Sequence, residues 1–340
     1  MTDLNKLKAG KLPLDLLDSL LSGVEINDPR VVLGPKAGED AALIDFGDRY
    51  LVTKTDPITF ATDLIGWYVV QINANDLAVM GATPKWLMVT MLLPEGTTTE
   101  EVSRIFEQLI EACKERDITL VGGHTEVTYD LNRPIVVGSM LGEVSKDKVV
   151  MTSGAQVGDS IILTKGAPIE GAAILAREAS EELIAAGVSS EIIEKAKNFL
   201  FAPGISVARD AEIATSAAKV HAMHDPTEGG IAGALLEFAT GAGVGLEIDA
   251  ARIPTPPEAQ TICDALALDP LGLIASGALL ATVAPEDAKK VIEALIREGI
   301  LAVEIGRLTT RDRGLKMRTT HGIVDLPRFK RDELARFFGV

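Results

Sequence analysis

The sequence contains few cysteines, because among its 340 residues only Cys113 and Cys263 carry a thiol. Two cysteines cannot build a disulfide framework or a cysteine-rich zinc site. Both lie in apolar stretches of helical pattern, where we interpret them as buried and unreactive thiols.

The sequence also lacks any segment rich in lysine and arginine. Its 33 basic residues are outnumbered by 49 acidic residues, which gives a formal net charge of −16. Nucleic-acid-binding proteins gain much of their affinity by neutralising phosphates with basic side chains, so the composition argues against that class. An acidic protein can still handle phosphates when a metal ion supplies the local positive charge.

Long hydrophobic runs are absent as well. No uninterrupted apolar segment reaches the roughly 18–20 residues that a membrane span needs, and Met1–Lys6 show no apolar region of a signal peptide. We therefore expect a cytoplasmic protein that does not bind membranes.

The composition is that of a globular protein, with 47% hydrophobic and 24% charged residues. A chain of this length exceeds what one hydrophobic core usually organises, which predicts two domains. Strand and helix patterns alternate in the first half, and a new series begins near residue 150. We therefore predict α/β domains at 1–150 and 151–340.

The predicted elements follow from periodicity and from Gly and Pro positions. Helices are expected at 12–22, 64–81, 97–116, 169–185, 189–199, 205–217, 227–240, 257–268 and 285–298. Strands are expected at 31–45 (two strands around a loop), 49–58, 86–94, 118–123, 134–144, 153–166, 220–225, 244–249 and 301–326. The continuous apolar run at 86–94, between Lys85 and Pro94, predicts a buried strand.

The predicted helix at 64–81 is apolar on almost every side and yet carries Gln71, Asn73, Asn75 and Asp76. Asn73 and Asp76 are three residues apart and share one face of the helix. A buried carboxylate is costly unless it meets a cation, a donor network or a cleft. Two interpretations stay open for Asp76: a metal or phosphate site, or a structural network with an arginine or backbone amides.

Two further carboxylates, Asp40 and Asp56, are expected at corners between apolar strands, in G-E-D-A-A and K-T-D-P. Either one alone is an ordinary turn residue. Together with Asp76 they offer the hard oxygen ligands that suit Mg²⁺ on phosphate oxygens. Lys36, just upstream, is interpreted either as a phosphate ligand or as a solvated loop lysine.

The segment from Gly122 to Glu126, G-G-H-T-E, follows an apolar strand pattern. Paired glycines at the end of a strand allow a ligand to approach the backbone closely. His124 and Glu126 would then present two titratable side chains at one strand exit. The alternative is a surface turn with an exposed histidine.

The segment H-D-P-T-E-G-G at 224–230 predicts a junction from strand to helix. Asp225 as the N-cap, Pro226 in the first turn and Glu228 three residues after the cap fit a capping box. That structural interpretation leaves Gly229 and Gly230 unexplained, since each glycine in a helix costs about 0.5–1 kcal/mol relative to alanine. Glycines at a helix N-terminus suit close contact with an anion, which here predicts a phosphate.

Other motifs are missing. The sequence has no G-x-x-x-x-G-K-[ST] phosphate-binding loop and no Ser/His/Asp hydrolase elbow. G-A-G-V-G at 241–245 follows a predicted helix and enters a strand, so it is interpreted as a helix stop and not as a dinucleotide-binding turn.

Taken in order, five motifs resemble the motif series of the aminoimidazole-ribonucleotide-synthetase (AIR synthase) superfamily. They are G-E-D-A-A-L-I-D, T-D-P, N-A-N-D-L-A-V-M-G-A-T-P, G-G-H-T-E and H-D-P-T-E-G-G, spread over residues 38–230. The superfamily groups purine enzymes, selenophosphate synthetase, thiamine-monophosphate kinase and the hydrogenase-maturation factor HypE. The stretch from Asp225 to Leu273 is particularly similar to HypE.

The resemblance implies a two-domain PurM-like α/β (α+β) fold, in which the N-terminal domain pairs across a dimer axis into a β-barrel. It also implies ATP and Mg²⁺ as cofactors and a homodimer. The implied metal ligands are Asp40, Asp56, Asp76 and Asp225. The predicted nucleotide contacts are Asn73, Gly122, Gly123, Thr125, Asp225, Thr227, Gly229 and Gly230, and the predicted catalytic residues are Asp76, His124 and Glu126.

The expected activity is ATP-dependent phosphorylation or activation of an oxygen atom, on a small molecule or on a carbamoyl-type group borne by a protein. A hydrogenase-maturation protein is an expected partner. HypE ends in a Pro-Arg-x-Cys tail that carries the carbamoyl group, whereas this sequence ends R-F-F-G-V. No cysteine precedes Cys113, where selenophosphate synthetases carry a reactive one.

Three alternatives therefore stay open: a non-catalytic ATP-binding maturation partner, a kinase similar to thiamine-phosphate kinase or selenophosphate synthetase, and a metal-dependent hydrolase that uses His124 and Glu126 without a nucleotide.

Overall fold

The computed structural model describes residues 7, 11–59 and 63–339, which fall into two compact units. The N-terminal unit comprises Ile26–Gly34 and Asp40–Val149. The C-terminal unit comprises Val150–Val340 together with two earlier segments, Met1–Glu25 and Pro35–Glu39. The predicted two-domain α/β fold is confirmed, and the second unit also takes in segments from the start of the chain.

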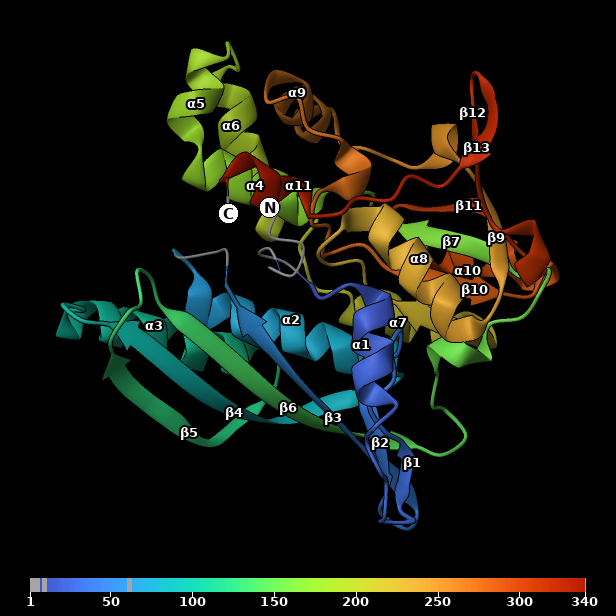
Figure 1. Ribbon diagram of the computed structural model, residues 1–340, viewed down its shortest axis with the longest axis horizontal. Helices are drawn as coiled ribbons and strands as arrows, with labels where there is room; N and C mark the ends of the chain where they lie inside the picture. The colour runs from blue at the N-terminus through green and yellow to red at the C-terminus, as the bar shows by residue number, and fades with distance from the viewer. Residues whose placement is uncertain (1–6, 8–10, 60–62, 340) are drawn as a thin grey trace, which may run out of the picture. The chain divides into compact units, whose positions relative to one another are not determined.

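The N-terminal unit contains a six-stranded sheet in the order β1-β2-β3-β6-β4-β5. Its strands are β1 (Val31–Leu33), β2 (Ala42–Asp45), β3 (Arg49–Ile58), β4 (Thr83–Pro94), β5 (Thr119–Thr128) and β6 (Ile135–Ser145). Neighbouring strands are antiparallel except β4 and β5, which are parallel. Helices α2 (Ile65–Val79) and α3 (Thr99–Glu115) lie along one face of this sheet (Figure 1).

Local sequence explains both helices. Thr98 and Glu101 form a reciprocal capping box at the start of α3, within the threonine cluster expected to cap it. α2 has almost no amphipathic pattern, and 14 of its 15 residues are buried, as the sequence indicated.

The strand predicted at 86–94 is present as part of β4, but it is buried on one face only. Burial alternates along β4: Leu87 and Val89 are buried, while Trp86 and Met88 are 36% and 47% exposed. The buried side chains meet the face that α2 and α3 cover. In the described part of this unit no helix covers the other face (Figure 1), so its apolar residues stay exposed.

One of the two expected corners lies inside a strand, whereas Asp40 lies in the loop before β2 as expected. Asp56 and Pro57 belong to β3, opposite Gly138 and Val137 of β6. Proline is tolerated there because the pairing of β3 with β2 ends at Thr53, so the missing N–H of Pro57 faces an unpaired edge.

The C-terminal unit contains a seven-stranded sheet in the order β13-β12-β9-β11-β7-β10-β8. Its strands are β7 (Ser160–Thr164), β8 (Val220–His224), β9 (Gly245–Asp249), β10 (Leu280–Val283), β11 (Ala302–Thr309), β12 (Leu315–Thr319) and β13 (Gly322–Asp325). Only β9 and β12 pair in parallel.

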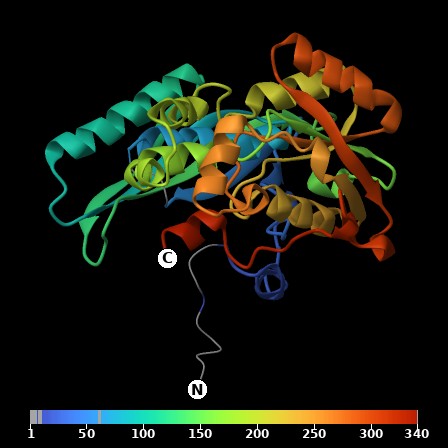
Figure 2. The ribbon, with the colours of Figure 1, turned by 90° about the horizontal axis from the view of Figure 1, so that it is seen from above.

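Helices cover both faces of this sheet. The described α-helices of the unit are α1 (Leu14–Leu21), α4 (Ile169–Glu178), α5 (Ser180–Ala185), α6 (Ser190–Lys197), α7 (Ala208–Ala217), α8 (Gly230–Ala242), α9 (Pro257–Ala265), α10 (Pro285–Arg297) and α11 (Glu333–Phe337). Ile231, Leu235 and Phe238 of α8 pack into a core with the strands, and α7 and α10 pack together on the opposite face (Figures 1 and 2).

The helix boundaries correct three expectations. The predicted helix at 169–185 is two helices, α4 and α5, and α11 was not predicted. The helix expected from residue 227 begins at Gly230. Among the described residues, no helix combines the length and the apolar character that crossing a bilayer requires.

Candidate functional site

The buried amides of α2 serve the structure of the N-terminal unit. Arg116 Nε donates a hydrogen bond to Gln71 Oε1 at 3.0 Å. Asn73 Nδ2 donates to the carbonyl oxygens of Val69, at 2.9 Å, and Asp56, at 3.3 Å, which ties α2 to β3. The Oδ1 atom of Asn73 is buried and has no hydrogen-bond partner among the residues described, so it can still accept a bond from a ligand.

A carboxylate cluster lies beside these amides. Asp76 and Asp40 are 3% and 7% exposed, and one carboxylate oxygen of each lies within 4.8 Å of the other. Lys54 Nζ lies 3.0 Å from Asp76 Oδ1 and 4.0 Å from Asp56 Oδ2. The N-terminal unit thus brings together Asp40, Asp56 and Asp76, three of the four predicted metal ligands, around one lysine.

The charge of Lys54 follows from this arrangement. Burial alone would lower the pKa of its ammonium group, but the charges of Asp76, Asp56 and Asp40 outweigh burial and raise that pKa above the usual value. Lys54 therefore stays protonated and partly neutralises the cluster. The sequence analysis did not single out Lys54, although the spacing K-x-D in a strand places Lys54 and Asp56 on one face.

The G-G-H-T-E segment lies in the middle of β5 and not at a strand exit, so that expectation is wrong. Gly123 has φ +152°, and a Cβ atom there would come 1.9 Å from the carbonyl oxygen of Val89 on β4. Only glycine fits this close approach of two backbones. His124 Nε2 lies 3.1 Å from Glu126 Oε2, and both side chains are exposed.

A cavity of about 420 Å³ adjoins this segment. It is bordered by Gly122, Gly123, His124 and Thr125 of β5 together with Leu120, Val121, Val89, Met91, Phe106 and Leu109. The cavity therefore combines an apolar floor with exposed backbone and a histidine, which is the composition of a small-molecule pocket.

In the C-terminal unit, the H-D-P-T-E-G-G segment connects β8 to α8. The N-cap of α8 is Gly229, with φ 86° and no side-chain cap, so the predicted Asp225 capping box is wrong. A Cβ on Gly230 would come 2.5 Å from the carbonyl oxygen of Leu271. Close packing against the backbone explains this glycine without any ligand.

A carboxylate of the chain itself lies at the N-terminus of α8. The backbone N–H of Gly229 donates to Asp332 Oδ2 at 2.6 Å. Burial raises the pKa of Asp332 to about 6, against the lowering effect of the Gly229 and Leu334 amides. The Gly229 amide that we had assigned to a phosphate thus has a partner within the protein.

Three other ionisable residues surround the same turn. Glu237 on α8 lies 3.4 Å from His224 Nε2 and 3.3 Å from Lys11 Nζ. Burial would raise the pKa of Glu237, but the hydrogen bond with His224 and the charge of Lys11 lower it to about 2. The sequence analysis missed Lys11 and Glu237, since no local pattern links residues 226 positions apart.

Glu170 is another buried acid of this unit. It lies on α4, is 4% exposed and accepts a hydrogen bond from the Ser276 amide at 3.3 Å. Burial raises its pKa to about 8, and the charges of Glu228 and Asp332 add to that effect. Glu170 is therefore mostly protonated near neutral pH.

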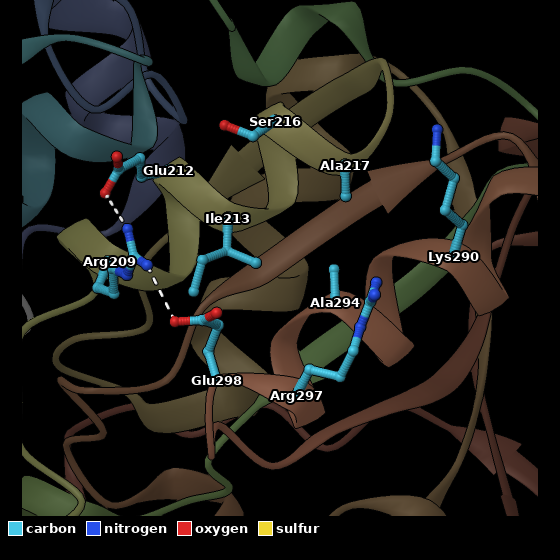
Figure 3. A pocket seen from close by; sticks show the side chains of 9 residues that line it. All are labelled: Arg209, Glu212, Ile213, Ser216, Ala217, Lys290, Ala294, Arg297 and Glu298. Atoms are coloured by element: carbon cyan, nitrogen blue, oxygen red, sulfur yellow. Dashed lines mark hydrogen bonds and ion pairs between the residues drawn. The ribbon is translucent and has the colours of Figure 1, made fainter.

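A second cavity of about 420 Å³ lies between α7 and α10 (Figure 3). Arg209 at its edge pairs with Glu212 at 2.8 Å and with Glu298 at 3.0 Å. Lys290 and Arg297 also line it. None of the site residues predicted from the sequence borders this cavity, so we do not assign it a role.

The sequence and the fold were compared with those of known proteins. The profile of AIR synthase related protein, N-terminal domain, matches residues 38–144, and that of its C-terminal domain matches residues 156–316. The chain is 32% identical to a putative hydrogenase expression/formation protein of Methanocaldococcus jannaschii over 332 residues, which covers 94% of each chain. It is 30% identical to carbamoyl dehydratase HypE of Rhodobacter capsulatus, with 93% of each chain covered.

Among solved structures, hydrogenase maturation protein HypE in complex with ATP superposes with a TM-score of 0.71 and 23% sequence identity. The match covers 93% of this chain and 95% of that one. It supports the same fold over nearly the whole chain.

Proposed function

The chain belongs to the family of AIR synthase related proteins, and from this premise we propose that it is an ATP- and Mg²⁺-dependent enzyme that phosphorylates or activates an oxygen atom of a small molecule or a carbamoyl-type group. The observation that carries the proposal is the buried cluster of Asp40, Asp76 and Lys54. Buried carboxylates this close together are costly unless cations neutralise them. A protein of the same fold, hydrogenase maturation protein HypE, has been solved in complex with ATP.

In the N-terminal unit, Asp40, Asp56 and Asp76 would hold Mg²⁺. In the C-terminal unit, Asp225 is proposed as a metal ligand. Oxygen ligands of this kind suit Mg²⁺, which keeps several waters and bridges phosphate oxygens. The bound ion would supply charge neutralisation for the transferring phosphoryl group. Before the ion binds, Lys54 neutralises Asp76 through their ion pair.

The nucleotide contacts are proposed on both units. Asn73 offers its Oδ1 as an acceptor, Gly122 and Gly123 offer exposed backbone, and Thr125 and Thr227 offer hydroxyl groups. Gly229 and Gly230 carry no side chains, so a ligand can approach the backbone of the turn before α8. The cavity beside β5 offers apolar contacts.

His124 and Glu126 are proposed to move the proton of the reaction. Their side chains are 3.1 Å apart and exposed, so Glu126 can orient the imidazole while the other ring nitrogen faces the acceptor. Asp76 is proposed to take part by holding the ion, since it already forms an ion pair with Lys54.

The acceptor is proposed to lie on a small molecule or on a partner protein. Cys113 and Cys263 are both buried, and burial raises the pKa of their thiols to about 11 and about 12. Neither can act as a reactive thiolate acceptor at neutral pH. Since the relatives are named hydrogenase expression/formation protein and carbamoyl dehydratase HypE, a hydrogenase-maturation protein is the proposed partner.

A homodimer is proposed through the uncovered face of the N-terminal sheet. Trp86 and Met88 expose apolar side chains on this face of β4, and β5 is an edge strand. Apolar patches and unpaired strand edges of this kind are typical of protein interfaces.

One observation favours a second candidate, a non-catalytic ATP-binding maturation partner. Lys54 already neutralises Asp76, so the cluster can remain stable without a bound ion. The two candidates differ in turnover and not in binding.

Isothermal titration calorimetry of the full chain with ATP, in the presence and absence of Mg²⁺, tests the proposal. We expect ATP binding that strengthens at least about tenfold with Mg²⁺, and release of phosphate once an acceptor is supplied. Binding without any release across carbamoyl and small-molecule acceptors would favour the second candidate. Absence of ATP binding in both conditions would refute both.

A further inference from the structure

Lys11 reaches the H-D-P-T-E-G-G segment from the start of the chain. Its Nζ atom donates to Thr227 Oγ1 at 2.9 Å and to both carboxylate oxygens of Glu237 at 3.3 Å. Glu228 Oε2 lies 3.9 Å away. All four residues belong to the C-terminal unit. The side chains of Thr227, Glu228 and Glu237 thus hold one ammonium group against the turn.

This arrangement differs from an ordinary surface ion pair. Exposed pairs contribute about 0–1 kcal/mol and are easily lost, whereas the side chain of Glu237 is only 15% exposed and also contacts His224. The side chain of Lys11 remains 41% exposed. The ammonium group is therefore held beside Thr227 by fixed partners, on a side chain that solvent still partly reaches.

The charges around the turn show what such a cation can do. Asp225, Glu228 and Glu237 place three carboxylates within one short segment and the following helix, and an anion would be repelled by them. The Gly229 amide, a natural donor to a phosphate, already donates to Asp332. A phosphate at this turn therefore needs another source of positive charge.

We propose that Lys11 is a phosphate-binding lysine of the nucleotide site, fixed beside Thr227 by Glu237. This inference rests on the proposed function, because it assumes that ATP phosphates lie at the Asp225–Thr227 turn. Lysine is suited to the role because its ammonium group is a compact point charge that binds phosphate oxygens. The sequence contains no phosphate-binding loop that would supply such a lysine locally, and the N-terminal segment supplies it from 216 residues away.

The test compares Lys11→Gln and Lys11→Arg with Lys289→Gln in the full chain. Lys289 is a matched control, since it is an exposed lysine on α10 that pairs with Glu293. Dissociation constants for ATP, ADP and adenosine are measured by calorimetry with Mg²⁺, and the melting temperature is measured for each variant. If Lys11 has only a structural role, Lys11→Gln would lower the melting temperature and weaken the binding of all three ligands equally.

We expect Lys11→Gln to raise the dissociation constant for ATP about 10–100-fold, since a charge-assisted hydrogen bond is lost. The dissociation constant for ADP should rise less, and that for adenosine should not change. Lys11→Arg should retain affinity to within about fivefold because it keeps the charge.

Equal affinities for ATP in Lys11→Gln and Lys289→Gln would overturn the inference. An equal loss of affinity for ATP and for adenosine in Lys11→Gln would overturn it as well. Failure of the unmodified protein to bind ATP would instead overturn the proposed function itself, and the inference with it.

Discussion

Lys54 and Asp76 form an ion pair between β3 and α2, with 3.0 Å between Nζ and Oδ1. The pair links β3 to a helix of which 14 of the 15 residues are buried, and Asp40 and Asp56 lie around the same ammonium group. This one contact explains how three carboxylates can be kept close together before any cation binds.

Asp76→Asn should abolish ATP turnover while the fold is kept. The amide has the size of the carboxylate but lacks the charge that would hold Mg²⁺, so we expect a loss of at least about a hundredfold. Phosphate release is measured with saturating ATP and Mg²⁺ and with an acceptor that supports turnover in the wild type. Asp147→Asn, at an exposed position of the same unit, is the matched control, and full turnover in Asp76→Asn would show that Asp76 has no part in the reaction.

Lys54→Gln should make stability depend on Mg²⁺. Removing the ammonium group leaves Asp76 and Asp40 without their cation, which costs about 1–3 kcal/mol in the absence of metal. Because Lys54 competes with the ion for Asp76, added Mg²⁺ should raise the melting temperature of the variant more than that of the wild type. Scanning calorimetry measures the melting temperatures of the variant and the wild type with EDTA and with Mg²⁺. An equal rise with Mg²⁺ in the two proteins would contradict a metal site at Asp76.

Gly123→Ala should destabilise the N-terminal unit. The new Cβ would meet the carbonyl oxygen of Val89, so β4 and β5 must separate at a cost of about 2–3 kcal/mol. Gly122→Ala is a control on the same strand, since a Cβ there meets nothing within 4 Å, and we expect a change within about 0.5 kcal/mol. Urea unfolding measures both, and similar values for the two variants would argue against the close approach.

Glu170→Gln should stabilise the protein at alkaline pH. The pKa of Glu170 is about 8 in the folded state against a reference value of 4.5, so between these values the folded state binds more protons than the unfolded state. Stability from this group is therefore present below pH 4.5 and is lost as the pH rises to about 8. At pH 8 the unfolding free energy should be lower than below pH 4.5 by on the order of 4 kcal/mol from this group.

The melting temperature of Glu170→Gln and of the wild type is compared from pH 5 to pH 9. The variant should lack the decline that the wild type shows across this window. Glu182→Gln, at an exposed position of α5, should keep the decline, and parallel curves for Glu170→Gln and the wild type would show that Glu170 is already ionised in the folded state.

Met88→Lys should prevent dimer formation. The side chain is 47% exposed on the uncovered face of β4, and a buried lysine without a partner would oppose pairing of that face with a second copy. Sedimentation velocity should show a dimer for the wild type and a monomer for this variant. Ile296→Lys, a similarly exposed apolar position on α10, should remain dimeric, and a monomeric wild type would rule out the proposed interface.

The sequence by itself determined the alternation of strands and helices and the main boundaries of most of them. Periodicity and capping are local properties, and they placed α2, α3 and β3 within a few residues of their positions. The ordered motifs likewise identified the family. Local pattern misjudged β4, because an apolar run does not tell whether a helix covers its second face.

Only the tertiary structure decided which side chains meet. Lys54 and Asp76 are 22 residues apart, and Lys11 and Thr227 are 216 apart. Distances of this kind depend on how strands pair and helices pack, and no local pattern encodes them. The capping box expected at Asp225 failed for the same reason: Asp332, from the far end of the chain, provides the acceptor at the start of α8, and the sequence around residue 225 contains no trace of it.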